Sequence, residues 1–142
     1  MTIRTVTVEE AYEEMSTHSE VNFVDVRTVP EYEAGHPQKS NNIPWVLPDP
    51  TTGEMTPNAG FLYAMEATFP QDQTLYVSCK MGGRSLGACY DLEKAGWTDL
   101  VNIDGGFGGK RDPEGNVIAP GWVDCALPVD TNESEYEEPM EF

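Results

Sequence analysis

Residues 76–89 read YVSCKMGGRSLGAC, and this stretch decides the fold that the sequence predicts. The apolar run 75–78 is of strand type and ends at Cys79, a loop with two glycines follows, and residues 85–95 have the pattern of a helix that stops at Gly96. Open α/β sheets bind ligands at such a point, where a strand ends and the next helix begins. The stretch therefore predicts an α/β domain with a site around Cys79.

Strands and helices alternate on both sides of this stretch. Thr7 and Glu10 have the spacing of a capping box, which predicts a short amphipathic helix to about Thr17. Further predicted elements are a strand at 21–26, a helical turn at 30–35, an extended piece at 42–45, a surface loop at 46–58, a helix capped by Asn58 that runs to about Phe69, and a strand at 100–103. In the helix at 85–95, the residues predicted to face inward are Leu86, Cys89, Tyr90 and Leu92. This alternation implies a mostly parallel central sheet flanked by helices.

The chain has 142 residues, close to the usual size of one domain, which we place at residues 1–129. Gly, Pro and charged residues dominate 108–121 and predict an insertion loop, after which residues 122–129 are expected to pack back on the body. Residues 130–142 hold six acidic residues and no basic one, which predicts a disordered acidic tail.

The overall charge is strongly negative, since 25 acidic residues oppose 8 basic ones for a formal net charge of -17. This field repels polyanions, so we expect neither nucleic acid nor a membrane surface as a partner. The three cysteines form no CxxC pair, and no GxGxxG or GK[ST] pattern occurs, so we expect no metal and no cofactor. With no stretch typical of a signal peptide or membrane span, a cytoplasmic location is expected.

The surroundings of Cys79 favour a thiolate. Amide groups at the start of the following helix, the helix dipole, and the charges of Lys80 and Arg84 all stabilise negative charge there. Gly82 and Gly83 let the loop curl so that successive N–H groups face one centre, which can bind an anion or a sulfur attached to the cysteine. We therefore predict that Cys79 is a nucleophile. The alternative is an ordinary buried cysteine beside a flexible turn.

Three separate motifs resemble one known family. The loop Cys79-Lys-Met-Gly-Gly-Arg84 resembles the active-site loop of the rhodanese family, in which a cysteine is followed by two variable residues, a glycine, one variable residue and often an arginine. Four short segments resemble the first signature of the family, namely 24–27 (VDVR), 31–32 (EY), 35–36 (GH) and 42–44 (NIP). Residues 102–107 (NIDGGF) resemble the strand and glycine pair that follow the active-site helix of the family. The resemblance spans about Val6 to Phe107 and implies a rhodanese-like three-layer fold.

The resemblance also implies a thiosulfate sulfurtransferase in which Cys79 accepts the sulfur. The pocket would be lined by the loop residues Lys80, Met81, Gly82, Gly83 and Arg84 through their backbone amides. The thiolate would attack the outer sulfur of thiosulfate, sulfite would leave, and the persulfide would pass its sulfur to cyanide or to a thiol. Lys80 and Arg84 would hold the dianionic donor and the departing sulfite.

Loop length argues against a phosphatase. Related cell-cycle phosphatases and arsenate reductases are expected to have five residues between cysteine and arginine, whereas four separate Cys79 from Arg84, and Ser85 stands at the phosphatase arginine position. Two other functions stay open. The chain could be a protein-to-protein persulfide carrier that docks through 108–121 and the acidic tail, or a non-catalytic rhodanese-like binding module, against which the intact cysteine loop argues.

Several other residues invite a functional interpretation. Asp25 and Arg27 are predicted to be structural ion-pair and hydrogen-bond partners, with Glu31 a further partner of Arg27. Cys89 fits a core position better than a resolving thiol, and Cys125 is the other candidate for that role.

The sequence departs from the family pattern in three places. Pro37 and Lys39 stand where an aliphatic residue and a glycine are commoner, and eighteen residues separate Phe107 from Ala126. A plain surface excursion is the favoured interpretation of this insertion, and a rim that selects the acceptor is the alternative.

Overall fold

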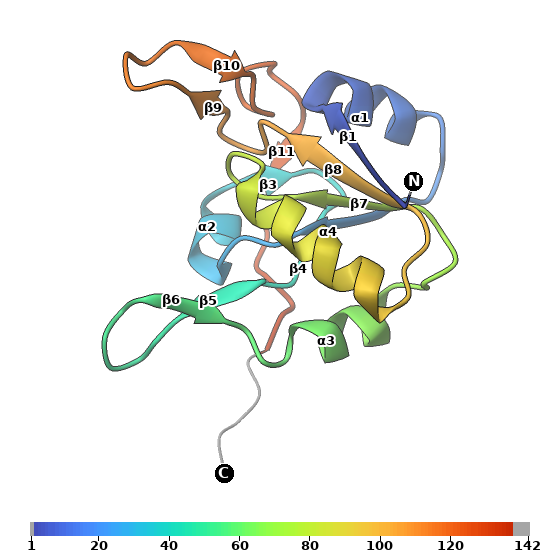
Figure 1. Ribbon diagram of the computed structural model, residues 1–142. Coiled ribbons are helices and arrows are strands. Elements are labelled where there is room, and N and C mark those ends of the chain that lie inside the picture. The colour runs from blue at the N-terminus through green and yellow to red at the C-terminus, as the bar shows by residue number, and fades with distance from the viewer. Residues whose placement is uncertain (1, 138–142) are drawn as a thin grey trace.

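A parallel five-stranded sheet forms the centre of the computed structural model, which describes residues 2–137 (Figure 1). In spatial order its strands are β1 (Ile3–Thr7), β8 (Leu100–Asp104), β7 (Leu75–Ser78), β2 (Asn22–Asp25) and β4 (Asn41–Asn42). Each strand runs parallel to its neighbours. The predicted parallel α/β sheet is therefore confirmed.

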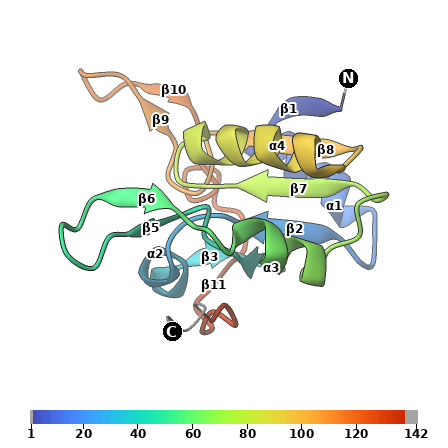
Figure 2. The ribbon, with the colours of Figure 1, turned by 60° about the horizontal axis from the view of Figure 1, so that its bottom comes forward.

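Helices cover both faces of this sheet and make three layers (Figure 2). The helices are α1 (Val8–Ser16), α2 (Val29–Ala34), α3 (Phe61–Thr68) and α4 (Gly83–Ala95). Val24 and Val77 pack with α3 and α4 in one apolar cluster, whereas Phe23 and Tyr76 pack with α1 and Trp122 in a second. Because successive strand residues point to opposite faces, the two clusters lie on opposite sides of the sheet.

Helix α1 begins as its sequence predicts. The Thr7 side chain accepts a hydrogen bond from the Glu10 amide at 3.1 Å, and the Glu10 carboxylate accepts one from the Thr7 amide at 3.0 Å. This capping box satisfies two amides that a helix start otherwise leaves unpaired. Val8, Ala11 and Met15 then bury one face of the helix against the sheet.

Two predicted loops contain antiparallel hairpins instead. In 46–58, β5 (Val46–Pro48) pairs with β6 (Met55–Pro57), and in 108–121, β9 (Lys110–Arg111) pairs with β10 (Val117–Ala119). Strands of two or three residues are too short to show the alternation by which a strand is recognised.

Two details of the predicted helices were wrong. Gly60 rather than Asn58 is the N-cap of α3, because the Asn58 side chain accepts from the Gly60 amide and shapes the turn before the helix. Tyr90 is 52% exposed although it was predicted to face inward. It follows the buried Cys89, and one helical step turns its side chain away from the sheet.

The segment predicted to be a disordered tail is ordered along most of its length. Strand β11 (Val129–Asp130) pairs antiparallel with β3 (His36–Pro37), and Trp122 before it is buried as expected. Three later side chains bond to the body, namely Asn132 to His36, Ser134 to Asn42 and Tyr136 to Asn58. Composition did not reveal these specific polar partners, which hold 130–137 despite its charge. Residues 138–142 lie outside the described part, so the prediction for them stays untested.

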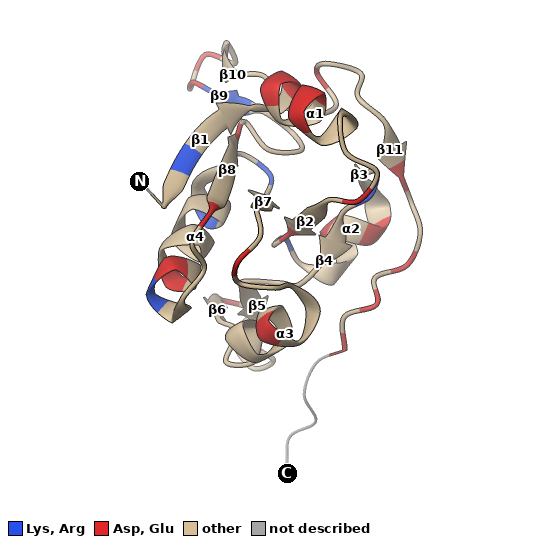
Figure 3. Ribbon diagram, turned by 90° about the vertical axis from the view of Figure 1, so that its right-hand side faces the viewer, with Lys and Arg blue, Asp and Glu red and all other residues tan. Residues whose placement is uncertain are grey.

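Acidic residues are distributed over the helices and the C-terminal segment, as Figure 3 shows. Within residues 2–137, five basic side chains form ion pairs, namely Arg4, Arg27, Arg84, Lys110 and Arg111. No helix in this range is long and apolar enough to cross a membrane.

Candidate active site

Cys79 lies at the carboxyl end of β7, where the sequence predicts the site. β7 ends at Ser78, and α4 begins at Gly83, so only four residues connect strand to helix. The Cys79 side chain is 1% exposed and belongs to the apolar cluster beneath α4. The cysteine therefore sits inside the turn rather than on its surface.

The backbone of this loop is held by the segment that follows β8. Three successive carbonyls, those of Cys79, Lys80 and Met81, accept hydrogen bonds from the amides of Phe107, Gly108 and Gly105 at 2.7, 2.9 and 2.9 Å. Since the described peptide bonds are all trans, each N–H points opposite to the carbonyl of its own peptide unit. The amides of Lys80, Met81 and Gly82 therefore point to the other side of the loop, away from 105–108.

One of these amides reaches the cysteine sulfur. The Gly82 N–H donates to Cys79 Sγ at 3.1 Å, and Gly82 has a φ of 121°, a conformation that side-chain-bearing residues rarely adopt. Gly106 is required for a different reason, because a Cβ there would collide with the Cys79 and Lys80 backbone. Gly82 thus lets its amide face the sulfur, and Gly106 lets the segment after β8 pack closely against the Cys79 loop.

A buried hydroxyl lies next to the same sulfur. Ser85 Oγ is 3.3 Å from Cys79 Sγ and 2.6 Å from Oδ1 of Asn102 on β8. Both Ser85 and Asn102 are buried. The Cys79 thiol donates to Ser85 Oγ, and the Ser85 hydroxyl donates to Asn102. A thiolate or persulfide at Cys79 can accept from the Gly82 amide and, when the Ser85 hydroxyl turns from Asn102 toward the sulfur, from Ser85. Hydrogen bonds of this kind favour the charged form of a buried acid.

The two cations near Cys79 differ in their partners. Arg84 donates to Glu31 on α2 through both terminal nitrogens, at 2.8 and 3.0 Å. Lys80 is exposed and has no ion pair among residues 2–137, and its stem lies over Gly108. The prediction that Lys80 and Arg84 bind a substrate anion is not tested by this arrangement, but only Lys80 has its charge free.

Glu31 stays ionised in this pair. Partial burial opposes ionisation, but the hydrogen bonds from Arg84 and Thr28 outweigh it and hold the pKa of Glu31 at about 2. The hydrogen bonds from Arg84 to Glu31 also raise the pKa of Arg84. Arg84 lies in the first turn of α4, directly after the Cys79 loop.

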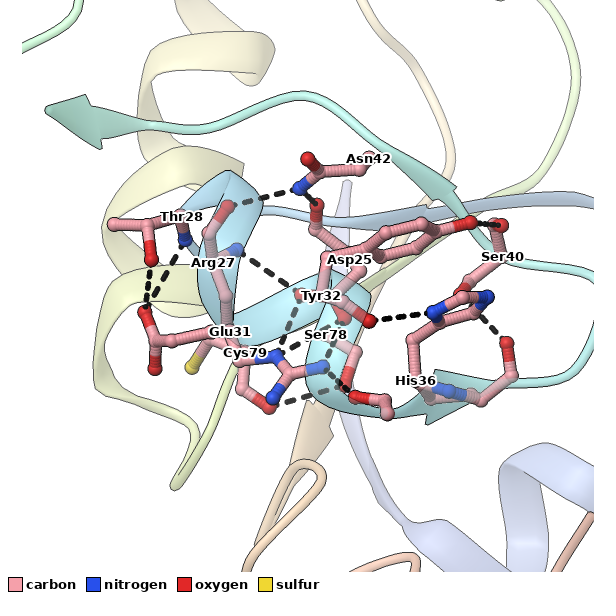
Figure 4. A network of polar contacts seen from close by, with 12 residues as sticks. Asp25, Arg27, Thr28, Glu31, Tyr32, His36, Ser40, Asn42, Ser78 and Cys79 are labelled. Atoms are coloured by element: carbon pink, nitrogen blue, oxygen red, sulfur yellow. Dashed lines mark hydrogen bonds and ion pairs between the residues drawn. The ribbon is translucent and has the colours of Figure 1, made fainter. Parts of the chain in front are cut away.

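Asp25 and Arg27 form a buried ion pair at the end of β2, in the polar network that Figure 4 shows. Arg27 Nη2 lies 2.7 Å from Asp25 Oδ2 and donates to the Gly35 carbonyl, and the guanidinium stacks 4.4 Å from the Phe107 ring. The expected structural role agrees with these contacts. The expected bond from Arg27 to Glu31 was wrong, because Glu31 pairs with Arg84.

The other two cysteines have different surroundings. Cys89 is fully buried in the middle of α4, and this burial raises the pKa of its thiol to about 12. Cys125 is partly exposed and packs against the cluster on the opposite side of the sheet from Cys79. Burial, with Glu9 and Asp124 nearby, also raises the pKa of Cys125. All three cysteines are free.

Sequence reasoning missed three contributors to the site. Ser85 was singled out only because a phosphatase has arginine there, Asn102 only as part of a motif, and Glu31 was given the wrong partner. The available signal for Asn102 is its polar side chain in the middle of the apolar strand 100–103. A buried polar side chain needs a partner, and the Cys79 loop supplies Ser85.

The family model for the rhodanese-like domain matches residues 7–109 of the chain. The chain belongs to the rhodanese-like family. The rhodanese-like fold is also that of the crystal structure of Rv0390 from M. tuberculosis, which is 29% identical with a TM-score of 0.73 and covers 90% of this chain and 97% of that one. The fold implied by the three motifs is therefore confirmed.

Two relatives of this rhodanese from Arabidopsis thaliana show how far the similarity extends. Rhodanese-like domain-containing protein 17 is 36% identical over 115 residues, which are 80% of this chain and 65% of that protein. Thiosulfate sulfurtransferase 18 is 32% identical over 115 residues, which are 80% of this chain and 74% of that protein. The chain thus spans somewhat less than two thirds of the first relative and about three quarters of the second.

One departure from the rhodanese pattern has a structural consequence. Lys39 stands where a glycine is commoner, and it has a φ of 74°, in the left-handed region that favours glycine. This conformation agrees with the glycine that the family resemblance leads one to expect there.

Proposed function

We propose that this rhodanese is a sulfurtransferase that moves a sulfane sulfur from thiosulfate, or from a related persulfide donor, through Cys79 to cyanide or a thiol. The observation that carries the proposal is the polar environment of the sulfur, in which the Gly82 amide donates to Cys79 Sγ at 3.1 Å and the Ser85 hydroxyl lies 3.3 Å away. Its family membership and the name of the relative thiosulfate sulfurtransferase 18 support the reaction type.

The first half-reaction loads the cysteine. The Cys79 thiolate attacks the outer sulfur of thiosulfate and forms a new S–S bond, while the S–S bond of thiosulfate breaks and its electron pair leaves with sulfite. The terminal sulfur of the persulfide keeps the negative charge. The loop amides that point away from 105–108 would stabilise that charge, as fixed donors do for other developing anions.

The second half-reaction returns the free enzyme. Cyanide, or the thiolate of an acceptor, attacks the outer sulfur of the persulfide, and the electron pair of the broken S–S bond returns to Cys79 as thiolate. Neither step transfers a proton through a general base. This agrees with the assignment of Asp25 to a buried ion pair rather than to catalysis.

A second candidate is a carrier that receives and delivers sulfur by docking to other proteins. The β9–β10 hairpin favours this alternative, because Val117 and Ile118 are 50% and 62% exposed on it. The hairpin begins two residues after Gly108, whose amide donates to the Lys80 carbonyl. A partner bound to the hairpin would therefore lie next to the Cys79 loop.

Mass spectrometry of the intact protein after incubation with thiosulfate tests the proposal. We expect the mass of one added sulfur atom on the native protein, removal of that mass by cyanide, and no addition to Cys79→Ser. An unmodified native protein, or equal addition to the variant, would refute the mechanism. Faster sulfur delivery to a protein acceptor than to cyanide or small thiols would favour the carrier.

A further inference from the structure

The ion pair between Glu31 and Arg84 is unexpected in a site built to bind an anionic donor. It joins α2 to the first turn of α4, and the two side chains are 29% and 27% exposed. Both terminal nitrogens of the guanidinium donate to the carboxylate. Bidentate arginine–carboxylate pairs have strong and well-directed hydrogen bonds. The positive charge nearest the start of α4 is therefore already matched by a negative one.

Glu31 is also held in place by its own helix. Its Oε1 accepts from the Thr28 amide at 3.2 Å and from the Thr28 hydroxyl at 3.0 Å, which completes the capping box of α2. If Glu31 moved away to free Arg84, it would give up these two bonds as well as the pair. The carboxylate is thus a fixed negative charge beside the loop.

The charges around Cys79 nearly cancel as a result. Asp25 neutralises Arg27, and Glu31 neutralises Arg84, which leaves Lys80 as the cation of the loop without an ion pair among residues 2–137. Lys80, Arg84 and Glu31 together carry a net charge of +1, whereas without the carboxylate they would carry +2. Because the Coulomb attraction is proportional to the charge of the donor, Glu31 weakens the attraction of a dianion more than that of a donor with at most one negative charge.

We propose that Glu31 adjusts donor selection by charge, so that it slows the loading of Cys79 from the dianion thiosulfate and leaves loading from alkyl persulfides with at most one negative charge nearly unchanged. This inference rests on the proposed function. With an alkyl persulfide, the Cys79 thiolate attacks the terminal sulfur of R–S–SH, a new S–S bond forms, and the old S–S bond breaks. Its electron pair leaves with the alkyl thiolate, and the proton stays on the transferred sulfur.

Glu31→Gln tests the selection while it keeps the helix cap, because glutamine is also a capping-box residue. The measurement is the second-order rate constant of persulfide formation at Cys79, by mass spectrometry, with thiosulfate and with the persulfide of 2-mercaptoethanol. We expect the constant for thiosulfate to rise about tenfold and that for the alkyl persulfide to change by no more than about twofold. The matched control is Glu33→Gln, which removes the same charge from an exposed position of the same helix and should change neither constant.

The double variant Glu31→Gln/Arg84→Gln keeps the inference testable even if the single variant fails to fold. Because it removes both charges of the pair, its thiosulfate constant should stay within about twofold of the native value. A large loss would show that Arg84 binds the donor in spite of Glu31. Equal changes for both donors in Glu31→Gln, or no change, would also overturn the inference while sulfur transfer through Cys79 stands. If neither donor loads the native protein, the proposed function itself fails.

Discussion

Cys79 and Cys89 are ten positions apart and equally buried, yet the start and the middle of α4 give them opposite chemical character. At the start of the helix, an amide and a hydroxyl lie within 3.3 Å of the Cys79 sulfur. In the middle, the amides are used by the helix itself, and burial raises the pKa of Cys89 to about 12. Donors that are free to face the sulfur, and not its exposure, distinguish a nucleophile from a core residue.

The largest expected effect is in the alkylation rates of these two thiols. With iodoacetamide at neutral pH, we expect Cys79 to react about a hundredfold faster than Cys89, because the thiolate is the reactive form. Since both side chains are hidden to the same extent, exposure cannot produce the difference. Peptide mapping after short labelling measures it. Equal rates would break the comparison.

Replacement of Cys89 by serine should affect the stability of the protein and not sulfur transfer at Cys79. Cys89→Ser places a hydroxyl in an apolar cluster and should lower the free energy of unfolding by about 1–3 kcal/mol. Denaturant titration measures this loss. Sulfur loading at Cys79 should be unchanged under conditions where the variant is folded, and a parallel loss of loading would assign Cys89 to the site.

Removal of the hydroxyl beside Cys79 tests whether the polar groups around this sulfur make it more reactive than Cys89. Ser85→Ala deletes the hydroxyl that lies 3.3 Å from the sulfur and that can turn to donate to a persulfide there, so we expect thiosulfate loading to slow by about tenfold. The matched control is Ser78→Ala, a buried serine beside the same cysteine whose hydroxyl donates to a carbonyl. If both variants slow equally, the effect is structural.

Lys80 contributes charge rather than a hydrogen bond to the sulfur. Lys80→Ala should raise the KM for thiosulfate about fivefold with little change in kcat, and the effect should shrink as salt increases. Lys94→Ala, which removes the same charge from an exposed position in the last turn of α4, should leave KM unchanged. An unaltered KM in Lys80→Ala would remove its anion-binding role.

The smallest expected effect is the acid dependence of the Glu31–Arg84 pair. The pKa of Glu31 is held at about 2, below the ordinary 4.5, so the stabilisation is fully present above pH 4.5 and is lost as the pH falls through 2. The native protein should be more stable than Glu31→Gln by about 1 kcal/mol at pH 7, after allowance for solvent screening, and equally stable near pH 2. Urea titrations at both pH values measure this, and a constant difference would contradict it.

How much of the site the sequence predicts depends on how local each interaction is. The strand, the glycine loop and the helix start around Cys79 are consecutive in the chain, and their residue types reveal them. Glu31 bonds to Arg84 across 53 positions, and Asn102 bonds to Ser85 across 17. Without the sheet order, no residue type shows which distant side chain supplies the partner, and for that reason Glu31 was paired with Arg27.

The fold shows the same limit at its C-terminal end. Charge density predicts disorder for 130–142, yet in 130–137 the pairing of β11 and three side-chain bonds determine the outcome. The hairpins at 46–58 and 108–121 were likewise not predicted, because strands of two or three residues are too short to show an alternation of apolar and polar residues. The buried strands β2, β7 and β8 were predictable as apolar runs and α1 by its capping box, whereas β1, which is mostly exposed, was not predicted.

The C-terminal segment has a consequence for folding during synthesis. Residues 129–136 are made after His36, Asn42 and Asn58, which they contact in β3, in β4 and in the turn before α3. Until this segment leaves the ribosome, the short edge strand β4 has an uncovered flank, and unpaired sheet edges invite contact with other chains. Residues 129–136 therefore complete the contacts of β3 and β4 only after these strands have been made.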